Sequence, residues 1–281
     1  MNNTKCVIIG NDSYLFHGFS DKLVDVDFYY LTFNDWRTDK NLEILQKADA
    51  VINFAISPDF STRDMNSDEI IDIQIARILK DANSRFLFIS SRKVYGTNKE
   101  CRTYKEDDAL TGFDFYSKNK IKTEKELTDI LGEKLCVFRV SNIIGEPVLR
   151  KNYKTFIGWI TESIVNNGFL KITQSKDAQK DFITKDFLHK AIAFFIGNKI
   201  SGIFNVSAGF PVKIGELLAD MAGKEKIIFD DAASCSNSEQ FVLDNSKLTY
   251  LTGLTFSPQA LKQGCLKFNE LLSKICQRRN I

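Results

Sequence analysis

Three neighbouring segments decide the fold: RFLFISSRKVYG at residues 85–96, FDFYSKNKIKTEKEL at residues 113–127 and KLCVFRVSNIIGE at residues 134–146. The apolar runs Phe86–Ile89 and Leu135–Val140 have the length of buried strands, and Tyr116–Leu127 between them has the pattern of a helix. Polar residues follow each strand, SSRK after the first and SN after the second. Because open α/β sheets bind ligands at the carboxyl ends of their strands, this edge is the predicted site.

On the predicted helix, Tyr116 and Lys120 are four residues apart and share one face. A lysine ammonium beside a phenol stabilises the phenolate, so the pair predicts a tyrosine with a lowered pKa. Ser91, delivered from the neighbouring strand, is placed to hold a substrate oxygen against the tyrosine. Together the three side chains predict a proton donor or acceptor for a carbonyl/alcohol pair.

The Ser, Tyr-x-x-x-Lys and SSRKVYG motifs together resemble the extended short-chain dehydrogenase/reductase family, which includes nucleotide-sugar epimerases, dehydratases and 4-ketoreductases. KCVIIG is similar to the family's first strand and turn, VINFA to its fourth-strand signature, and FRVSNIIG to its sixth strand. KDFITKDFLHKAI and GIFNVSAGFPVKIGELL resemble two further family stretches. The similarity covers nearly the whole chain in the right order.

The resemblance implies a doubly wound, Rossmann-type parallel sheet of the α/β class with a smaller C-terminal substrate lobe. Residues 1–145, with a strand and a helix returning near 181–206, would form the dinucleotide-binding domain. Residues 146–180 and 207–281 would form the lobe. A homodimer is implied by analogy with the family.

The resemblance also implies roles for particular residues. Ser91, Tyr116 and Lys120 would be catalytic, with NAD or NADP as the cofactor. A nucleotide-diphosphate sugar would be the substrate, bound by Arg92, Lys93, Asn142 and Lys180. The residues expected to line the cofactor, besides Tyr116 and Lys120, are Gly10, Ser13, Tyr14, Leu15, Asp35, Arg37, Asn53, Phe54, Ala55 and Ser90.

The amino-terminal segment departs from the family's glycine fingerprint. Residues 6–9 predict a buried strand that ends at Gly10, and Ser13–Leu23 predicts a short helix. Aligned from Gly10, the second fingerprint glycine becomes Ser13 and the third becomes Phe16. The serine is a small change beside a helix N-terminus that binds phosphate, whereas Phe16 forces a wider helix–sheet gap or a shifted helix.

One strand, Val26–Phe33, and one helix, Asn41–Ala48, lie where family members usually have two strands. The strand is either the second one, with Asn34 or Asp35 near the ribose, or the third one, with the ribose-reading strand absent. Arg37 is placed either to pair with a 2′-phosphate or to lie solvated on the surface.

Composition excludes several function classes. The 281 residues carry 38 basic and 36 acidic side chains, a net charge of +2, and they interleave along the chain, so no nucleic-acid partner is expected. Six cysteines without C-x-x-C spacing and two histidines predict no metal site. The amino terminus lacks a signal-peptide core and no apolar run reaches about 18 residues, so the chain is expected to be cytoplasmic, without a membrane partner.

Arg92 and Lys93 bear on the type of reaction. In the family's 4,6-dehydratases the two residues after the catalytic hydroxyl are an acidic pair, and a basic pair supplies no carboxylic acid. The two cations either lie in a solvated loop, or form an ion pair with Asp107 or Asp108, or bind the sugar or its diphosphate.

The sequence therefore predicts NAD(P)-dependent reduction of a 4-keto nucleotide-diphosphate sugar, as in the synthesis of deoxysugars or surface polysaccharides. Epimerisation of a nucleotide sugar is the related alternative. A second alternative is a non-catalytic family member, because of Ser13, Phe16 and the single strand that precedes VINFA.

Overall fold

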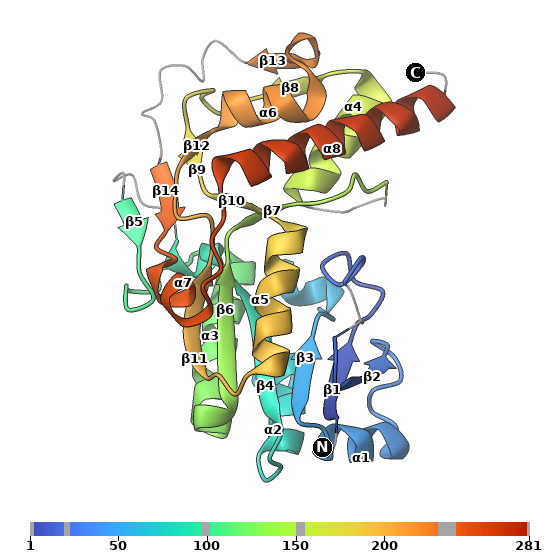
Figure 1. The fold of residues 1–281 in the computed structure, drawn as a ribbon, viewed down its shortest axis with the longest axis vertical. Coiled ribbons are helices and arrows are strands. Elements are labelled where there is room, and N and C mark those ends of the chain that lie inside the picture. The colour runs from blue at the N-terminus through green and yellow to red at the C-terminus, as the bar shows by residue number, and fades with distance from the viewer. Residues whose placement is uncertain (1–2, 20–22, 97–101, 150–154, 230–239, 280–281) are drawn as a thin grey trace.

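The computed structural model describes residues 3–19, 23–96, 102–149, 155–229 and 240–279. Its centre is a six-stranded sheet in which every neighbouring pair of strands is parallel, in the order β11-β6-β4-β3-β1-β2 (Figure 1). These strands are Thr4–Ile9 (β1), Val26–Leu31 (β2), Ala50–Asn53 (β3), Arg85–Ser91 (β4), Leu135–Val140 (β6) and Gly202–Val206 (β11). The predicted parallel α/β sheet is confirmed.

Both faces of the sheet are covered, as a doubly wound fold requires. On one face, Val7, Val51 and Phe86 share a core with Asp39–Gln46 (α1), Ile71–Leu79 (α2) and Phe115–Leu131 (α3). On the other face, Ile8, Ile52 and Leu87 share a core with Lys185–Gly197 (α5). Adjacent strand residues point to opposite faces, so the central strands are apolar throughout.

β2 pairs with β1 along its whole length, from Thr4 opposite Val26 to Ile9 opposite Leu31. The segment is therefore the second strand, and the alternative in which the second strand is missing is wrong. Among the described residues no strand lies beyond β2, so the sheet ends there. The position just past the end of β2 is held by Thr32.

The segment after β1 differs from the prediction. Residues 11–18 form successive turns, residues 20–22 lie outside the described residues, and residue 23 is not helical. The predicted helix Ser13–Leu23 is wrong. Phe16 explains the difference, because its ring lies 5.7 Å from the rings of Tyr30, Phe54 and Phe19 and fills the sheet face that a helix would cover.

A second core lies above the carboxyl edge of the sheet (Figure 1). It is built on Phe156–Asn167 (α4), Ile214–Ala222 (α6) and Pro258–Arg278 (α8). The short strands around it are Leu170–Ile172 (β8) paired with Ile227–Phe229 (β13), and Asn142–Ile144 (β7) paired with Phe182–Thr184 (β10). The division into a dinucleotide-binding domain and a substrate lobe stays a prediction.

A four-stranded sheet joins distant parts of the chain, in the order β12-β9-β14-β5. Its strands are Val212–Lys213 (β12), Gln179–Lys180 (β9), Gln240–Leu243 (β14) and Arg102–Tyr104 (β5). The helix Ser246–Thr252 (α7) follows β14. None of the described helices is long and apolar enough to cross a membrane.

Candidate functional site

The predicted catalytic residues meet at the carboxyl edge of the central sheet. β4 ends at Ser91, and α3 begins beside it. Asp114 caps α3 by accepting a hydrogen bond of 2.7 Å from the backbone N–H of Ser117, which fixes the first turn and places Tyr116 within it. The cap therefore fixes where α3 begins, with Tyr116 in its first turn.

Ser91, Tyr116 and Lys120 lie together. The Ser91 hydroxyl lies close enough to the Tyr116 phenol to oppose the rise in its pKa. Lys120 is only 6% exposed, and its Nζ donates to the backbone carbonyl of Ile89 at 2.7 Å. Nζ is 5.9 Å from the centre of the Tyr116 ring and 4.4 Å from that of Phe88. The two hydroxyls can therefore act on one oxygen atom, above a buried amine.

The pKa of Tyr116 differs from the prediction. Burial raises it to about 12; the Ser91 hydrogen bond opposes this shift, and the charges of Asp114 and Asp72 add to it. Burial also lowers the pKa of Lys120. The expected lowering of the phenol's pKa by Lys120 is therefore wrong for the protein alone. In the protein alone, burial keeps Tyr116 protonated at neutral pH, and the protonated phenol is the form that donates a proton.

Ser90 is not open to the edge of the sheet. It is 3% exposed, and its hydroxyl donates to the carboxylate of Glu124. Glu124 in turn pairs with Arg139 at 2.7 Å, and Arg139 also donates to the Tyr95 hydroxyl at 3.0 Å. This network lies directly beneath the site. Arg139, a charged residue inside the buried apolar run of β6, is the feature of the sequence that could have predicted it.

Gly10 lies where the chain turns at the end of β1. Its φ is +79°, and a Cβ placed there would lie 2.6 Å from the backbone nitrogen of Ala55. Asn53 fixes the opposite side, because its Oδ1 accepts from the N–H of Ala55 and its Nδ2 donates to the Ala55 carbonyl. Phe54 is turned away, into contact with Phe16. The two strand ends are thus held at the distance that only glycine allows.

We expect Gly10→Ala to weaken both folding and cofactor binding. The added methyl group meets the positive φ and the Ala55 backbone at once, so β1 and β3 must separate. Gly168→Ala is the matched control, because Gly168 has a φ of +78° with no atom within 4 Å of the added Cβ. In urea unfolding, the free energy of unfolding should fall by about 1–2 kcal/mol for the control and by more for Gly10→Ala. Equal losses of stability in the two variants would contradict the close approach of Gly10 to the backbone of Ala55.

Ser13, Tyr14 and Leu15 brace the turns after β1. Ser13 Oγ accepts from the N–H of Leu15 at 3.4 Å, and the Leu15 carbonyl contacts Nε2 of His189 on α5 at 2.7 Å. The Tyr14 hydroxyl donates to the backbone carbonyl of Glu146 at 3.2 Å. The segment predicted to bind the cofactor is therefore fixed to both α5 and the chain that enters the lobe.

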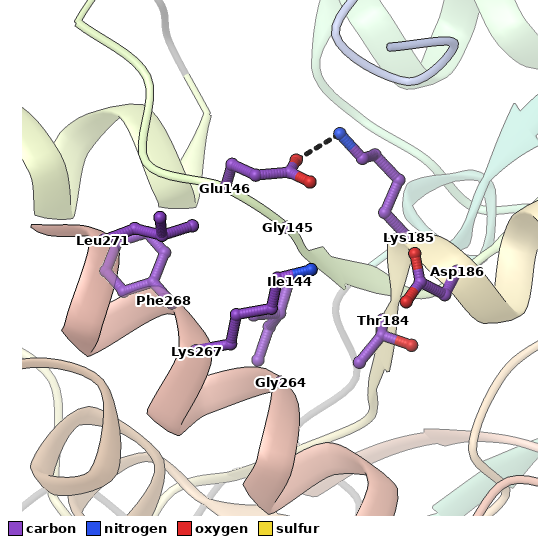
Figure 2. A pocket seen from close by; sticks show the side chains of 10 residues that line it. All are labelled: Ile144, Gly145, Glu146, Thr184, Lys185, Asp186, Gly264, Lys267, Phe268 and Leu271. Carbon is purple, nitrogen blue, oxygen red and sulfur yellow. Dashed lines mark hydrogen bonds and ion pairs between the residues drawn. The ribbon is translucent and has the colours of Figure 1, made fainter. Parts of the chain in front are cut away.

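A small pocket lies where the segment of residues 144–146, which enters the lobe, meets α5 and α8. Figure 2 shows the Lys185 ammonium pointing toward the Glu146 carboxylate, with which it forms an ion pair, while Lys267 and Phe268 come from α8. The Lys185 Nζ also lies 4.6 Å from the centre of the Tyr14 ring. Sequence reasoning missed Lys185 and Glu146, because the contact joins segments that are far apart in the chain.

Asp35 and Arg37 have local partners. Asp35 Oδ1 accepts from the N–H of Thr32 at 2.7 Å, which closes the turn after β2. Arg37 donates to Oε1 of Gln74 at 3.0 Å, and its guanidinium lies 4.3 Å from the centre of the Trp36 ring. Of the two placements considered for Arg37, the structure supports the surface one.

On the lobe side, Arg92 and Asn142 are in direct contact. Arg92 Nε donates to Asn142 Oδ1 at 2.9 Å, and its guanidinium lies 4.9 Å from the centre of the Phe241 ring on β14. Asn142 Nδ2 donates to the backbone carbonyl of Asp181 at 2.7 Å. These contacts aim two of the predicted substrate residues at the boundary between the sheet and the lobe.

The other two predicted substrate residues, Lys93 and Lys180, are bound to partners of their own. Lys93 pairs with Asp114 at 3.0 Å, and not with Asp107 or Asp108 as one of the alternatives had it. Asp108 pairs with Arg102 at 2.7 Å. Lys180, on β9, donates to Oε1 of Gln174 at 3.1 Å.

The residues at this edge fit a nicotinamide dinucleotide. Gly10 leaves the space that a Cβ would fill, and Asn11 Oδ1 is buried at the same turn without a hydrogen-bond partner among the described residues. That oxygen can accept from a hydroxyl or an amide. Tyr116 and Lys120 stand along the same edge, beside β4, which is separated from β1 by β3. Turns replace the usual helix N-terminus, so backbone amides of a different geometry would meet the diphosphate.

Comparison with known proteins agrees with the fold. Residues 2–207 match the model of the NAD dependent epimerase/dehydratase family. No curated protein matches the chain. Among solved structures, UDP-N-acetylglucosamine 4-epimerase from Methanobrevibacter ruminantium is 17% identical with a TM-score of 0.78, over 98% of this chain and 100% of the other.

A reductase shares the same fold. The dTDP-4-dehydrorhamnose reductase from Bacillus anthracis, solved with NADP, is 15% identical with a TM-score of 0.69, over 95% of this chain and 98% of the other. At these identities the two structures establish a common fold, while the family match spans most of the chain. On that match, the protein belongs to the NAD dependent epimerase/dehydratase family.

Proposed function

We propose that the protein catalyses NAD(P)-dependent reduction of a 4-keto nucleotide-diphosphate sugar. The observation that carries the proposal is that Ser91 and Tyr116 meet at the end of β4, with the buried Nζ of Lys120 5.9 Å from the centre of the Tyr116 ring. Neighbouring structures include an epimerase in complex with UDP-N-acetylmuramic acid and a reductase in complex with NADP. These titles support a nucleotide sugar as substrate and NAD or NADP as cofactor.

The chain's own residues would perform the proton transfer. The bound cofactor supplies the hydride that reduces the sugar carbon. The Ser91 hydroxyl orients the carbonyl oxygen, and the Tyr116 hydroxyl donates its proton to that oxygen. A charged Lys120 stabilises the phenolate that remains and is placed to hold the nicotinamide ribose.

We assign substrate binding to the cationic groups at the lobe boundary. Arg92 is oriented by Asn142, so its guanidinium can meet the diphosphate or the sugar, and Lys180 lies on the neighbouring β9. Lys93 borders the same site, 5.6 Å from the centre of the Tyr116 ring. Two cations directly after Ser91 provide no acid for a dehydration, which favours reduction or epimerisation.

Titration with NADH and with NADPH, followed by nicotinamide fluorescence, tests the proposal first. We expect one of them to bind. Product analysis with dTDP-, UDP- and GDP-linked 4-keto-6-deoxy sugars should then show one alcohol formed for each cofactor oxidised. Sugar inversion without net cofactor consumption would instead identify an epimerase.

The turns that replace a helix after β1 favour one other hypothesis, namely a family member without catalytic activity. Binding of neither NADH nor NADPH would support that reading and refute the redox proposal. A homodimer through α3 and its neighbour α2 stays a prediction, and sedimentation of the purified protein tests it.

A further inference from the structure

α2 carries a buried carboxylate that the proposed chemistry leaves without a role. Asp72 is 5% exposed, and its Oδ1 accepts a hydrogen bond of 2.9 Å from Nδ2 of Asn53. Within the described part of the chain, no lysine, arginine or histidine forms a direct ion pair with it. A carboxylate is rarely buried this deeply without a compensating charge.

The ammonium of Lys120 is the matching buried cation. Around Nζ lie the carbonyl of Ile89 at 2.7 Å and the rings of Phe88 and Phe60, with centres at 4.4 and 5.2 Å. All three are neutral. In so little water, an ammonium without an anion nearby tends to lose its proton.

Asn53, which binds Asp72, lies opposite Phe88 in the pairing of β3 with β4. The Nζ of Lys120 lies 4.4 Å from the centre of that Phe88 ring, so Asp72 and Lys120 stand over the same pair of strands. The second carboxyl group that acts on Lys120 is Glu124, on its own helix. Glu124 is already neutralised by its ion pair with Arg139. Tyr116, the third titratable neighbour, is protonated at neutral pH. Asp72 is therefore the carboxyl group that is left to balance the charge of Lys120.

The two groups influence each other reciprocally. Burial lowers the pKa of Lys120, and the charge of Asp72 raises it. Burial raises the pKa of Asp72, and both the charge of Lys120 and the Asn53 hydrogen bond lower it. Each group thus favours the charged form of the other.

We propose that Asp72, oriented by Asn53, is a positioning residue that keeps Lys120 charged beside Tyr116. The role rests on the proposed function, because a charged Lys120 is needed where Tyr116 gives up its proton. Asn53 also holds Ala55, which lies against Gly10. The same asparagine thus joins the lysine's counter-charge to the turn at the end of β1.

Asp72→Asn tests the proposal, because the amide keeps the shape of the side chain and removes its charge. In protein labelled with ¹³C and ¹⁵N on lysine, with Lys120→Met assigning the signal, we expect the pKa of Lys120 to fall by about 1–2 units. The alkaline limb of kcat should move to lower pH by the same amount, since Lys120 then loses its proton earlier. An unchanged pKa of Lys120 would overturn the proposal.

Asp68→Asn is the matched control. Asp68 precedes α2, pairs with Arg77 and has a side chain that is 83% exposed, so its loss should leave the Lys120 signal in place. If Asp72→Asn does not fold, the reciprocal measurement applies: Lys120→Met should raise the pKa of the Asp72 carboxyl. If the pKa of Asp72 is the same in Lys120→Met as in the unaltered protein, the proposal is overturned as well.

The outcomes separate this inference from the proposed function. If Asp72→Asn lowers the pKa of Lys120 but the protein turns over no nucleotide sugar, the coupling of Asp72 to Lys120 is supported and the proposed function is refuted. Turnover of a 4-keto sugar with an unshifted Lys120 supports the function and overturns the role of Asp72.

Discussion

Tyr116→Phe should abolish turnover, lowering kcat by about 10³-fold, the scale of a lost general acid. The variant removes only the hydroxyl that meets Ser91, while the ring keeps its contact with Phe60, whose centre is 5.8 Å away. Because the fold around the ring is unchanged, the Kd for NADH or NADPH should stay nearly the same. Steady-state kinetics and a fluorescence titration on one preparation measure both quantities.

Tyr250→Phe is the control for this substitution. Tyr250 is 94% exposed on α7, far in sequence from the site, so its loss should leave both kcat and Kd unchanged. A Tyr116→Phe protein that retains turnover and loses cofactor affinity would refute the assigned role. The phenol would then be a binding group and not the proton donor.

The elements that carry Ser91, Tyr116 and Lys120 were predictable from sequence because each follows from a local pattern. Short apolar runs bounded by polar residues gave β4 and β6, and the spacing of Tyr116 and Lys120 gave their common helix face. Parallel strands place their carboxyl ends at one edge, so the meeting of the three side chains follows once the sheet is known.

The turn after β1 was not predictable in the same way. Residues 13–23 have a composition that a helix accepts, but the aromatic ring of Phe16 packs on Tyr30 of β2 and on Phe54, which follows β3. That contact depends on the sheet order and not on local spacing. β5 is a similar case, since its partner β14 lies more than a hundred residues along the chain.

The pKa of Tyr116 was predicted with the wrong sign for a related reason. The spacing of Tyr116 and Lys120 gives their distance but not the burial of either group, and burial dominates both shifts. The role proposed for Asp72 was missed as well, because an acidic residue in an amphipathic helix gives no sign of being buried. Side-chain environment, rather than residue type, decides these properties.

Arg139→Met should be the most destabilising substitution beneath the site, by about 3–5 kcal/mol in the free energy of unfolding. The side chains of Arg139 and Glu124 are 3% and 5% exposed, so removing the guanidinium leaves a carboxylate buried without its cation. The Tyr95 hydroxyl and the Glu106 carbonyl lose a donor at the same time. Urea unfolding followed by circular dichroism measures the loss.

A double variant separates the buried charge from the lost packing. Glu124→Leu combined with Arg139→Met leaves no charge behind, so it should be more stable than Arg139→Met alone, because the penalty falls on the unpaired ion and not on the missing pair. Lys274→Met is the surface control, since its ion pair with Glu270 on α8 is largely exposed and should contribute nothing measurable. A double variant that is no more stable than Arg139→Met would mean that the geometry of the network, through Ser90 and Tyr95, supports β4 more than its charge balance does.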